Sequence, residues 1–516
     1  MIRQHHLVTR FTHRQIRTFN SSSINQSNLP VVPLWINGQA VTSSSSESVI
    51  HKHSKTGEES CKVVVAGEEE TKQAIEGSRK AFEQWRDVNG WERKGILQNV
   101  VKLLKERSNT FTEALRADAS FADIVISGDQ MSAIHLTEGA AETAISVEGT
   151  IPQTKDGNFS MILRQPYGPV LSIPAFNYPL TLAMRSIANP LACGNTILLR
   201  SSPLLPQFFG LLGPLFQDSG LPKGALQTLN FSDKDVPERV DQMISHKDVR
   251  MINFTGSVRL GKILAAKCGE HLKPSLLELG GKSVAIVLPS ADLKLAANNI
   301  LFGAFFNSGQ VCMATEQVLV HSDVAAEFEK VLKETAEEAN WSEGMEMVRP
   351  GSGNGAKALY DDAVKEGAKT LYSSSSMSAS SSSPTSFPPT IITSLSSRSK
   401  LFREESFAPL LSIHTFKSNK EILDYSNSHL TGLTSSIFTT DFNEAFKLSE
   451  KLEIGAIHIN GMTIHDQHNL PHGGWKESGW GRFNGKGAIE SFTQTKNIRF
   501  VNNPINFPLD AIYKGL

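Results

Sequence analysis

The chain has 516 residues, of which 40% are hydrophobic and 20% charged, and its formal net charge is −1. This length can bury more than one core, and the composition is typical of a soluble globular protein. A charge so close to zero gives no reason to expect nucleic acid or a membrane surface as a partner, and no apolar run is long enough to span a bilayer. The four cysteines lie far apart, which argues against a disulfide framework and against a zinc site.

The N-terminal segment differs from the rest of the chain. Its first 46 residues contain four arginines but no lysine and no acidic residue, and serines cluster at Ser21–Ser23. Residues 2–19 can form a basic helix with sparse apolar anchors. This composition predicts a mitochondrial presequence over residues 1–30 and a location in the mitochondrial matrix. The alternative is a tail without a targeting role, and the protein would then be cytoplasmic.

The next segments predict a strand, a set of helices and a further strand. Residues 34–38 are typical of an opening strand and turn. Residues 69–116 are rich in alanine, lysine and glutamate, with apolar spacing near 3.6, which predicts amphipathic helices. Alternating apolar residues predict a strand over residues 158–165.

Two later regions each predict a sheet covered by helices. From residue 169 to residue 288, short apolar runs alternate with helix-like stretches, which is typical of a parallel α/β sheet. A second α/β set extends from residue 293 to about residue 460, with strands expected at residues 317–320, 410–416 and 456–460. The serine-rich stretch 373–383 interrupts this second set and predicts a surface loop.

A cysteine and a glutamate stand out as a possible catalytic pair. Cys312 lies in the segment FFNSGQVCMA, thirty-four residues after Glu278 in LLELGGK. A thiolate can attack a carbonyl carbon, and a carboxylate can activate water for a later step. Judged by residue type alone, Cys312 is better explained as a small buried hydrophobic residue, as most free cysteines are.

A glycine turn suggests a phosphate site. The segment FTGSVRLG, residues 254–261, follows a strand-like run and precedes a helix-like run. The N-terminus of a helix offers free N–H groups and a positive dipole end, which suit a pyrophosphate, and Ser257 adds a hydroxyl donor. A glycine before a helix is otherwise an ordinary turn.

Seven motifs in a fixed order carry a family resemblance. From about Leu34 to Asn502 the chain resembles the NAD(P)-dependent aldehyde dehydrogenase superfamily. The matching segments are PAFNYP (174–179), LACGNT (191–196), FTGS (254–257), the Glu278 and Cys312 segments, EESFAP (404–409) and PHGGWKESGWGR (471–482).

The resemblance implies an α/β fold made of a Rossmann-type cofactor domain, an α/β catalytic domain and a small β oligomerisation arm. It places the dinucleotide-binding domain at residues 31–150 and 167–288, and the catalytic domain at residues 289–485. Residues 151–166 and 490–510 would form the arm that joins subunits into a homodimer or homotetramer.

The resemblance also assigns catalytic roles. Cys312 would attack an aldehyde, and the thiohemiacetal would become a thioester after hydride transfer to the cofactor. The Asn177 side chain and the Cys312 backbone N–H would stabilise the oxyanion. Glu278 would activate the water that releases the carboxylic acid. Many relatives carry a second glutamate where this chain has Phe483, so any proton relay must differ.

The resemblance implies a set of cofactor-binding residues. Glu405 would hold the nicotinamide ribose, and Phe407 would pack on the nicotinamide. Arg200 stands where the family has lysine, and Pro203 replaces a glutamate that favours NAD. We therefore expect NAD as the cofactor, with NADP possible. The remaining expected contacts are Phe176, Thr255, Gly256, Ser257, Gly261 and Leu279.

The substrate expectation rests on the last motif, which resembles the salicylaldehyde and vanillin dehydrogenase branch. Arg185 could contact a ring hydroxyl or could form a structural salt bridge, and Tyr178 and Phe306 could wall an aromatic pocket or simply pack. An aromatic aldehyde is therefore the expected substrate. The alternatives are an aliphatic aldehyde or semialdehyde, and a catalytically silent relative with a structural or binding role.

Overall fold

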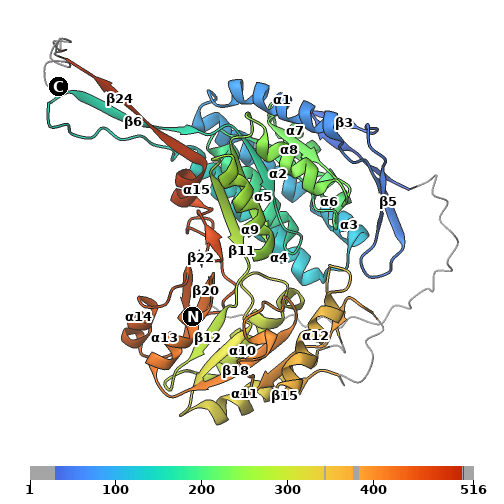
Figure 1. Ribbon diagram of the computed structural model, residues 1–516, viewed down its shortest axis with the longest axis vertical. Coiled ribbons are helices and arrows are strands. Elements are labelled where there is room, and N and C mark those ends of the chain that lie inside the picture. The colour runs from blue at the N-terminus through green and yellow to red at the C-terminus, as the bar shows by residue number, and fades with distance from the viewer. Residues whose placement is uncertain (1–28, 342–343, 376–382, 503, 505–516) are drawn as a thin grey trace, which may run out of the picture.

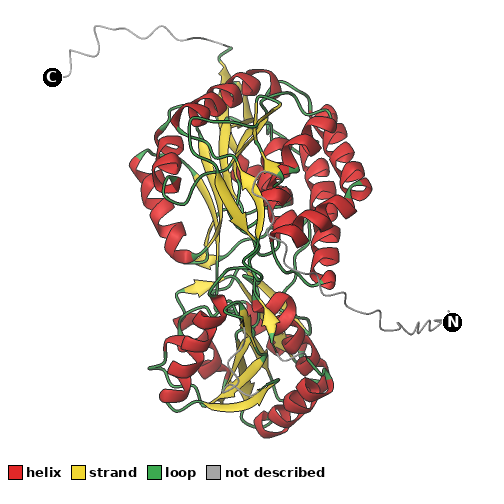
Figure 2. Ribbon diagram, turned by 90° about the vertical axis from the view of Figure 1, so that its right-hand side faces the viewer, coloured by secondary structure: helices red, strands yellow, loops and turns green. Residues whose placement is uncertain are grey.

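The computed structural model describes residues 29–341, 344–375, 383–502 and 504, which form two α/β bodies and a projecting ribbon (Figure 1). In each body, helices cover both faces of a sheet (Figure 2). This confirms the α/β prediction. Residues 1–28, which make up nearly all of the predicted presequence, and residues 376–382 of the predicted serine-rich loop lie outside the described residues.

The larger body is built on an eight-stranded sheet. Its five central strands are parallel, and β23, β2 and β3 pair antiparallel at the two ends. These parallel strands are almost wholly buried, as their continuous apolar runs predict. In spatial order the strands are β23 (Gly479–Trp480), β11 (Ser275–Leu279), β10 (Met251–Gly256), β7 (Pro169–Ile173), β8 (Thr196–Arg200), β9 (Leu226–Leu229), β2 (Leu34–Ile36) and β3 (Gln39–Val41).

The smaller body contains a seven-stranded sheet, parallel except for β15 at one edge. The three strands predicted after residue 293 are confirmed as β13, β18 and β21. The run near residues 283–288 was expected to belong to the first sheet, and that expectation is wrong, because β12 pairs with β13 and β20 instead. In order the strands are β15 (Lys369–Ser373), β17 (Thr390–Thr393), β18 (Leu410–Phe416), β13 (Gln317–His321), β12 (Val284–Val287), β20 (Thr434–Phe438) and β21 (Ala456–Ile459).

The helices expected over residues 69–116 are confirmed as α1, α2 and α3. Among the described residues, none of the helices combines the length and apolar character needed to cross a membrane. The helices are α1 (Glu68–Trp85), α2 (Gly90–Glu106), α3 (Ser108–Asp118), α4 (Asp123–Ala144), α5 (Pro179–Ala192), α6 (Pro206–Gly210), α7 (Leu212–Asp218), α8 (Val236–Ser245), α9 (Val258–Glu270), α10 (Leu293–Phe305), α11 (Ala325–Glu338), α12 (Ser352–Lys365), α13 (Asn419–Ser428), α14 (Phe442–Ser449) and α15 (Gly485–Phe492).

A two-stranded ribbon projects from the larger body (Figure 1). β6 (Phe159–Pro166) pairs antiparallel with β24 (Thr493–Phe500) along its whole length, so the predicted pairing of this strand with the C-terminal tail is confirmed within the chain. Its role in joining subunits stays a prediction, as do the domain boundaries. The remaining short elements are β1 (Val31–Val32), β4 (Val49–Lys52), β5 (Glu59–Val63), β14 (Met345–Glu346), β16 (Ser386–Phe387), β19 (Thr431–Gly432), β22 (Trp475–Lys476) and the 3₁₀ turns at Phe306–Gly309 and Lys400–Phe402.

Candidate active site

The site begins at the carboxyl ends of β10 and β11, the edge of a parallel sheet where ligands commonly bind. The parallel register sets Thr255 beside Glu278, and β23 sets Gly479 on the other side of Glu278. The Glu278 side chain is fully buried. The sheet therefore presents a carboxylate at its functional edge without exposing it to bulk water.

Cys312 follows a tightly wound turn. Asn307, Ser308 and Gly309 are consecutive residues with positive φ, a conformation that costs free energy for residues other than glycine and is found mostly where a site requires it. A Cβ at Gly309 would lie 2.3 Å from the Ala408 carbonyl oxygen, so no larger residue fits there. The turn fixes the direction in which Cys312 enters the site.

The same turn holds Asn177. The Asn307 side-chain amide donates to the Asn177 carbonyl at 2.7 Å, and the Asn177 side-chain amide donates to the Gln310 carbonyl at 2.9 Å. Because a primary amide has two N–H groups, one N–H of Asn177 is left for another acceptor. Residues 130 positions apart in sequence are thus locked into one unit around Cys312.

Glu278 and Cys312 influence each other's ionisation. Burial and then the Glu278 carboxylate raise the pKa of the Cys312 thiol well above its ordinary value. Burial by itself would raise the pKa of Glu278, but His472 and Arg185 outweigh that effect, and the net pKa of Glu278 lies below its ordinary value. The resting pair is therefore a neutral thiol beside an ionised carboxylate, which can accept the thiol proton.

Two cavities meet at this pair. One has a volume of about 530 Å³ and contacts Thr255, Glu278 and Glu405. The other has a volume of about 800 Å³ and contacts Tyr178 and Phe306 among other residues. Asn177 and Cys312 line both cavities, so a group in one can approach a group in the other across the sulfur atom.

The smaller cavity has features that fit a dinucleotide. The Phe176 and Phe407 rings lie edge to face with centroids 6.4 Å apart. Gly280 lets the Glu405 carboxylate approach the backbone closely, because a Cβ there would lie 2.2 Å from one of its oxygens and would displace it. Burial and then the nearby Glu316 raise the pKa of Glu405 to about 8. A ribose diol, by donating to this carboxylate, would offset the cost of burying it.

The predicted cofactor residues divide into two groups. Those that line the cavity are Phe176, Thr255, Gly256, Ser257, Glu405 and Phe407. Ser257 also caps α9, since its hydroxyl accepts from the Leu260 N–H at 3.4 Å. Three others lie outside the cavity: Gly261 and Leu279 pack together, because a Cβ at Gly261 would lie 2.5 Å from Leu279, and Arg200 ends β8.

A buried ion pair, which was missed in the sequence, fixes the loop that carries Glu405 and Phe407. Lys282 pairs with Glu316, and both are almost completely buried. Glu316 accepts the Ser406 N–H at 2.8 Å and the Phe407 N–H at 3.2 Å. Lys282 stands in the LELGGK segment, so one interaction connects the Glu278 strand with the cofactor loop.

The three predicted substrate residues all line the larger cavity. Tyr178 and Phe306 lie edge to face with centroids 6.2 Å apart. Arg185 is 3% exposed, forms an ion pair with Asp466 and lies over the Phe483 ring at 5.7 Å. The salt-bridge interpretation of Arg185 is therefore confirmed, and the side chain also faces the cavity.

Two further polar residues near Glu278 were not identified as site residues from the sequence. The His472 Nε2 lies 3.5 Å from Glu278 Oε1, and the His472 Nδ1 lies 3.6 Å from Asp466 Oδ1. His472 lies in the segment PHGGWKESGWGR, and Asp466 lies shortly before it. The only sequence signal was the presence of ionisable residues in and near that motif, which does not indicate what they contact.

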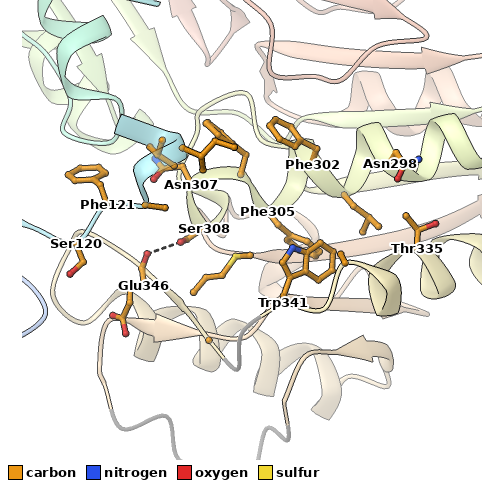
Figure 3. A pocket seen from close by; sticks show the side chains of 18 of the residues that line it. Ser120, Phe121, Asn298, Phe302, Phe305, Asn307, Ser308, Thr335, Trp341 and Glu346 are labelled. Carbon is orange, nitrogen blue, oxygen red and sulfur yellow. Dashed lines mark hydrogen bonds between the residues drawn. The ribbon is translucent and has the colours of Figure 1, made fainter. Parts of the chain in front are cut away.

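A third cavity has a volume of about 880 Å³ (Figure 3). Phe305 and Trp341 meet edge to face at 5.0 Å in its wall, and the Ser308 hydroxyl donates to the Glu346 carbonyl at 2.7 Å. Phe302 and Phe306 line both this cavity and the larger one, and their rings stack 5.1 Å apart. Ile124 and this pair of rings therefore lie between the two cavities.

The helix that carries Arg185 depends on a buried cap. Asp129 is 1% exposed and accepts the Leu180 N–H and the Thr181 N–H at 2.8 Å each, at the start of α5. Burial raises the pKa of Asp129 to about 6. The two backbone donors would be left unpaired in a dry interior without this carboxylate.

Replacing this cap should destabilise the protein measurably. We expect Asp129→Ala to lower the free energy of unfolding by about 1–3 kcal/mol, because two buried donors lose their acceptor. The matched control is Asp123→Ala, an exposed aspartate at the start of α4 whose pairing with Arg116 is solvent-screened. Urea denaturation of both variants measures the difference, and equal midpoints would contradict the buried-cap role.

The comparisons with known proteins agree with this site. Residues 40–498 match the Aldehyde dehydrogenase family. A vanillin dehydrogenase from Pseudomonas fluorescens is 36% identical over 93% of this chain and 99% of its own. A salicylaldehyde dehydrogenase from a Pseudomonas species, strain C18, is 34% identical over 90% and 96%. The crystal structure of a salicylaldehyde dehydrogenase from Pseudomonas putida G7, complexed with salicylaldehyde, superposes with a TM-score of 0.88 at 33% identity, covering 93% of this chain and 100% of that one.

The chain belongs to the aldehyde dehydrogenase family. It is an NAD(P)-dependent oxidoreductase that acts on an aldehyde, as the resemblance implied. The aldehyde dehydrogenase fold is confirmed as well.

The predicted location in the mitochondrial matrix is wrong. The vanillin, salicylaldehyde and benzaldehyde dehydrogenases that resemble most of this chain are bacterial proteins, and they give no support to a mitochondrial address or a transit peptide. The prediction rested on the composition of a basic N-terminal segment. Arginine and serine content alone does not distinguish a targeting signal from another basic tail.

Proposed function

We propose that this enzyme oxidises an aromatic aldehyde to its carboxylic acid. The observation that carries the proposal is that Asn177 and Cys312 line two cavities at once, one suited to a dinucleotide and one walled by aromatic rings. The vanillin and salicylaldehyde dehydrogenases among its relatives support the same substrate class.

Cys312 is the proposed nucleophile. Glu278 takes the thiol proton, and the sulfur attacks the aldehyde carbon to form a thiohemiacetal. The free N–H of the Asn177 amide and the Cys312 backbone N–H donate to the developing oxyanion. Donors held in place in this way typically contribute about 3–4 kcal/mol each to transition-state stabilisation.

The smaller cavity is the proposed cofactor site. Glu405 would accept the ribose hydroxyls, Phe407 would pack on the nicotinamide, and Ser257 at the start of α9 would face the pyrophosphate. NAD or NADP, when bound, supplies the hydride acceptor. We propose NAD as the preferred cofactor and NADP as an alternative, since Pro203 presents no carboxylate to repel a 2′-phosphate.

Glu278 is the proposed base in the second half-reaction. The thioester on Cys312 must be hydrolysed, and a buried carboxylate beside the sulfur can remove a proton from the attacking water. The low pKa of Glu278 keeps it ionised at neutral pH and so ready to accept. Hydrolysis, rather than transfer to a thiol acceptor such as coenzyme A, follows from the presence of this base.

Aromatic selectivity is proposed to come from the walls of the larger cavity. Tyr178, Phe302 and Phe306 present ring faces and edges, which favour a flat aryl group. Arg185 is held by Asp466 and lines this cavity. Its guanidinium is the proposed donor to a ring hydroxyl on the substrate.

A substrate panel tests this proposal directly. We expect kcat/KM for benzaldehyde, vanillin and salicylaldehyde to exceed that for succinic semialdehyde and propanal by at least about 100-fold, since a ring fills the cavity that a short chain leaves wet. The panel is run with NAD and NADP in parallel. Equal efficiency for aryl and aliphatic aldehydes would defeat the aromatic assignment and favour a general or semialdehyde dehydrogenase.

The raised pKa of Cys312 predicts a steep pH dependence for alkylation of the cofactor-free enzyme. Only the thiolate reacts with iodoacetamide, and a raised pKa leaves little thiolate at neutral pH. The inactivation rate should therefore increase about tenfold per pH unit from about pH 6 to about pH 9. A rate that levels off near neutral pH would show that the thiol is already ionised.

The projecting ribbon is proposed to join subunits in a homodimer or homotetramer. Phe159 and Phe500 lie on it with rings 5.5 Å apart and are each more than two-fifths exposed. Large apolar side chains on a thin exposed ribbon favour contact with another subunit. Sedimentation of the purified protein would measure the oligomer size.

A further inference from the structure

A chain of buried polar side chains begins at Glu278 and leads away from Cys312. The His472 Nε2 faces Glu278 Oε1 at 3.5 Å, and its Nδ1 faces Asp466 Oδ1 at 3.6 Å. His472 is 7% exposed and Glu278 is fully buried. One imidazole therefore stands between two carboxylates, with a different nitrogen toward each.

The far end of this row of polar side chains reaches the larger cavity, in which the aldehyde is proposed to bind. Asp466 lines that cavity, and its side chain is 15% exposed. Its position is fixed by the ion pair with Arg185 and by the Asn484 amide, which donates to Asp466 Oδ1 at 3.0 Å. Asp466 is thus the point at which the buried chain meets water.

The charged groups along this row of side chains come from three different elements. Glu278 comes from β11, Asp466 from the loop after β21, and Arg185 from α5, where it pairs with Asp466. The fourth neighbour is His458 on β21. Burial, and then His465 and His472, lower the pKa of His458 to about 4, so it stays neutral and adds no charge.

Glu278 needs a route by which to lose a proton. Each turnover releases one proton besides the one that leaves with the carboxylic acid, and Glu278 collects it from the thiol or from water. Neither Glu278 oxygen has a regular hydrogen bond to any other described residue. Phe483 offers no relay, because it is an apolar ring that is fully buried beside His472.

We propose that His472 is a positioning residue that also carries this proton from Glu278 to Asp466. The proposal rests on the proposed role of Glu278 as base. Water loses a proton to Glu278 as its oxygen bonds to the thioester carbon, and the C–S bond then breaks. The Glu278 proton passes to His472 Nε2, the Nδ1 proton passes to Asp466, and Asp466 returns to its ionised form by releasing a proton to cavity water.

The test uses His472→Gln in the full-length enzyme. The glutamine amide can still donate toward Glu278, but it cannot accept a proton and pass one on. We expect the first turnover, seen as a burst of NADH, to remain, and the steady-state rate to fall about 10-fold to 100-fold because thioester hydrolysis becomes slow. His472→Asn, whose amide faces Asp466 instead, is the second variant. His458→Gln, which changes a half-buried neighbour that forms no ion pair with Glu278 in the described structure, is the matched control.

Two readouts separate a proton route from mere packing. Imidazole, added at constant pH and ionic strength, should raise the steady-state rate of His472→Gln and leave the wild-type rate unchanged, because a diffusing base replaces the lost one. Hydroxylamine, which attacks the thioester without needing Glu278, should restore turnover and so show that acylation is intact.

The outcomes distinguish the relay from the function on which it depends. A His472→Gln enzyme that shows neither a burst nor a response to imidazole or hydroxylamine would overturn the relay, as would one with wild-type steady-state rates. If Glu278→Gln itself hydrolyses the thioester at the wild-type rate, the proposed base is wrong, whatever His472 does.

Discussion

Cys312→Ala should abolish aldehyde oxidation, lowering kcat/KM by at least about 10⁴-fold. The sulfur forms the covalent bond through which both half-reactions pass, and no other cysteine is close: Cys61, Cys193 and Cys268 are buried elsewhere in the described structure. NADH formation from benzaldehyde at saturating NAD measures the loss.

Cys61→Ala provides the control for this substitution. Cys61 is fully buried in β5, outside the cavities, and burial raises the pKa of its thiol to about 12. The Cys61→Ala enzyme should keep full activity despite losing a buried thiol. Retention of activity in Cys312→Ala would exclude covalent catalysis by this residue, and a wild-type protein inactive toward every aldehyde would favour the silent-relative interpretation.

Glu278→Gln should separate the two half-reactions. The amide is nearly the same size as the carboxylate but cannot accept a proton, so hydrolysis should slow and the steady-state rate should fall by about 10²–10⁴-fold. The enzyme should still complete one turnover and release about one NADH per active site before stalling as the thioester, provided that another base takes the thiol proton. Rapid mixing with absorbance detection measures the burst.

Glu142→Gln controls for the loss of one carboxylate. Glu142 forms an ion pair with Lys94 on the surface, and its side chain is 63% exposed, so its removal should change neither phase. If Glu278→Gln loses the burst and the steady state to the same degree, Glu278 is needed mainly to ionise the thiol. If both phases are unchanged, Glu278 is not the base.

The sequence predicted the centre of the site because its residues stand in recognisable segments. Asn177 and Cys312 were expected to meet around one carbonyl, and the structure brings them together through Asn307 and Gln310. Glu278 lies beside Cys312, as expected. Strand runs such as β13 and β18 were also predictable, since continuous apolar residues bounded by helices indicate buried parallel strands.

Long-range pairings were not predictable in this way. The apolar run of β12 indicates a strand but carries no information about its neighbours, so it was assigned to the wrong sheet. The Lys282–Glu316 pair and the contact between His472 and Glu278 join residues far apart in sequence, and single charged or ionisable residues usually lie on solvated surfaces. Their burial becomes visible only once the fold brings them together.

The stacked Phe302 and Phe306 rings have a consequence for how the substrate range of this enzyme could change during evolution. Together with Ile124 they line both the substrate cavity and the neighbouring cavity, and their rings stack against each other. Replacing one of these phenylalanines by a small residue would join the two cavities without moving a strand or a catalytic atom. We therefore expect a small side chain at either position to let the enzyme accept bulkier, branched or multi-ring aldehydes.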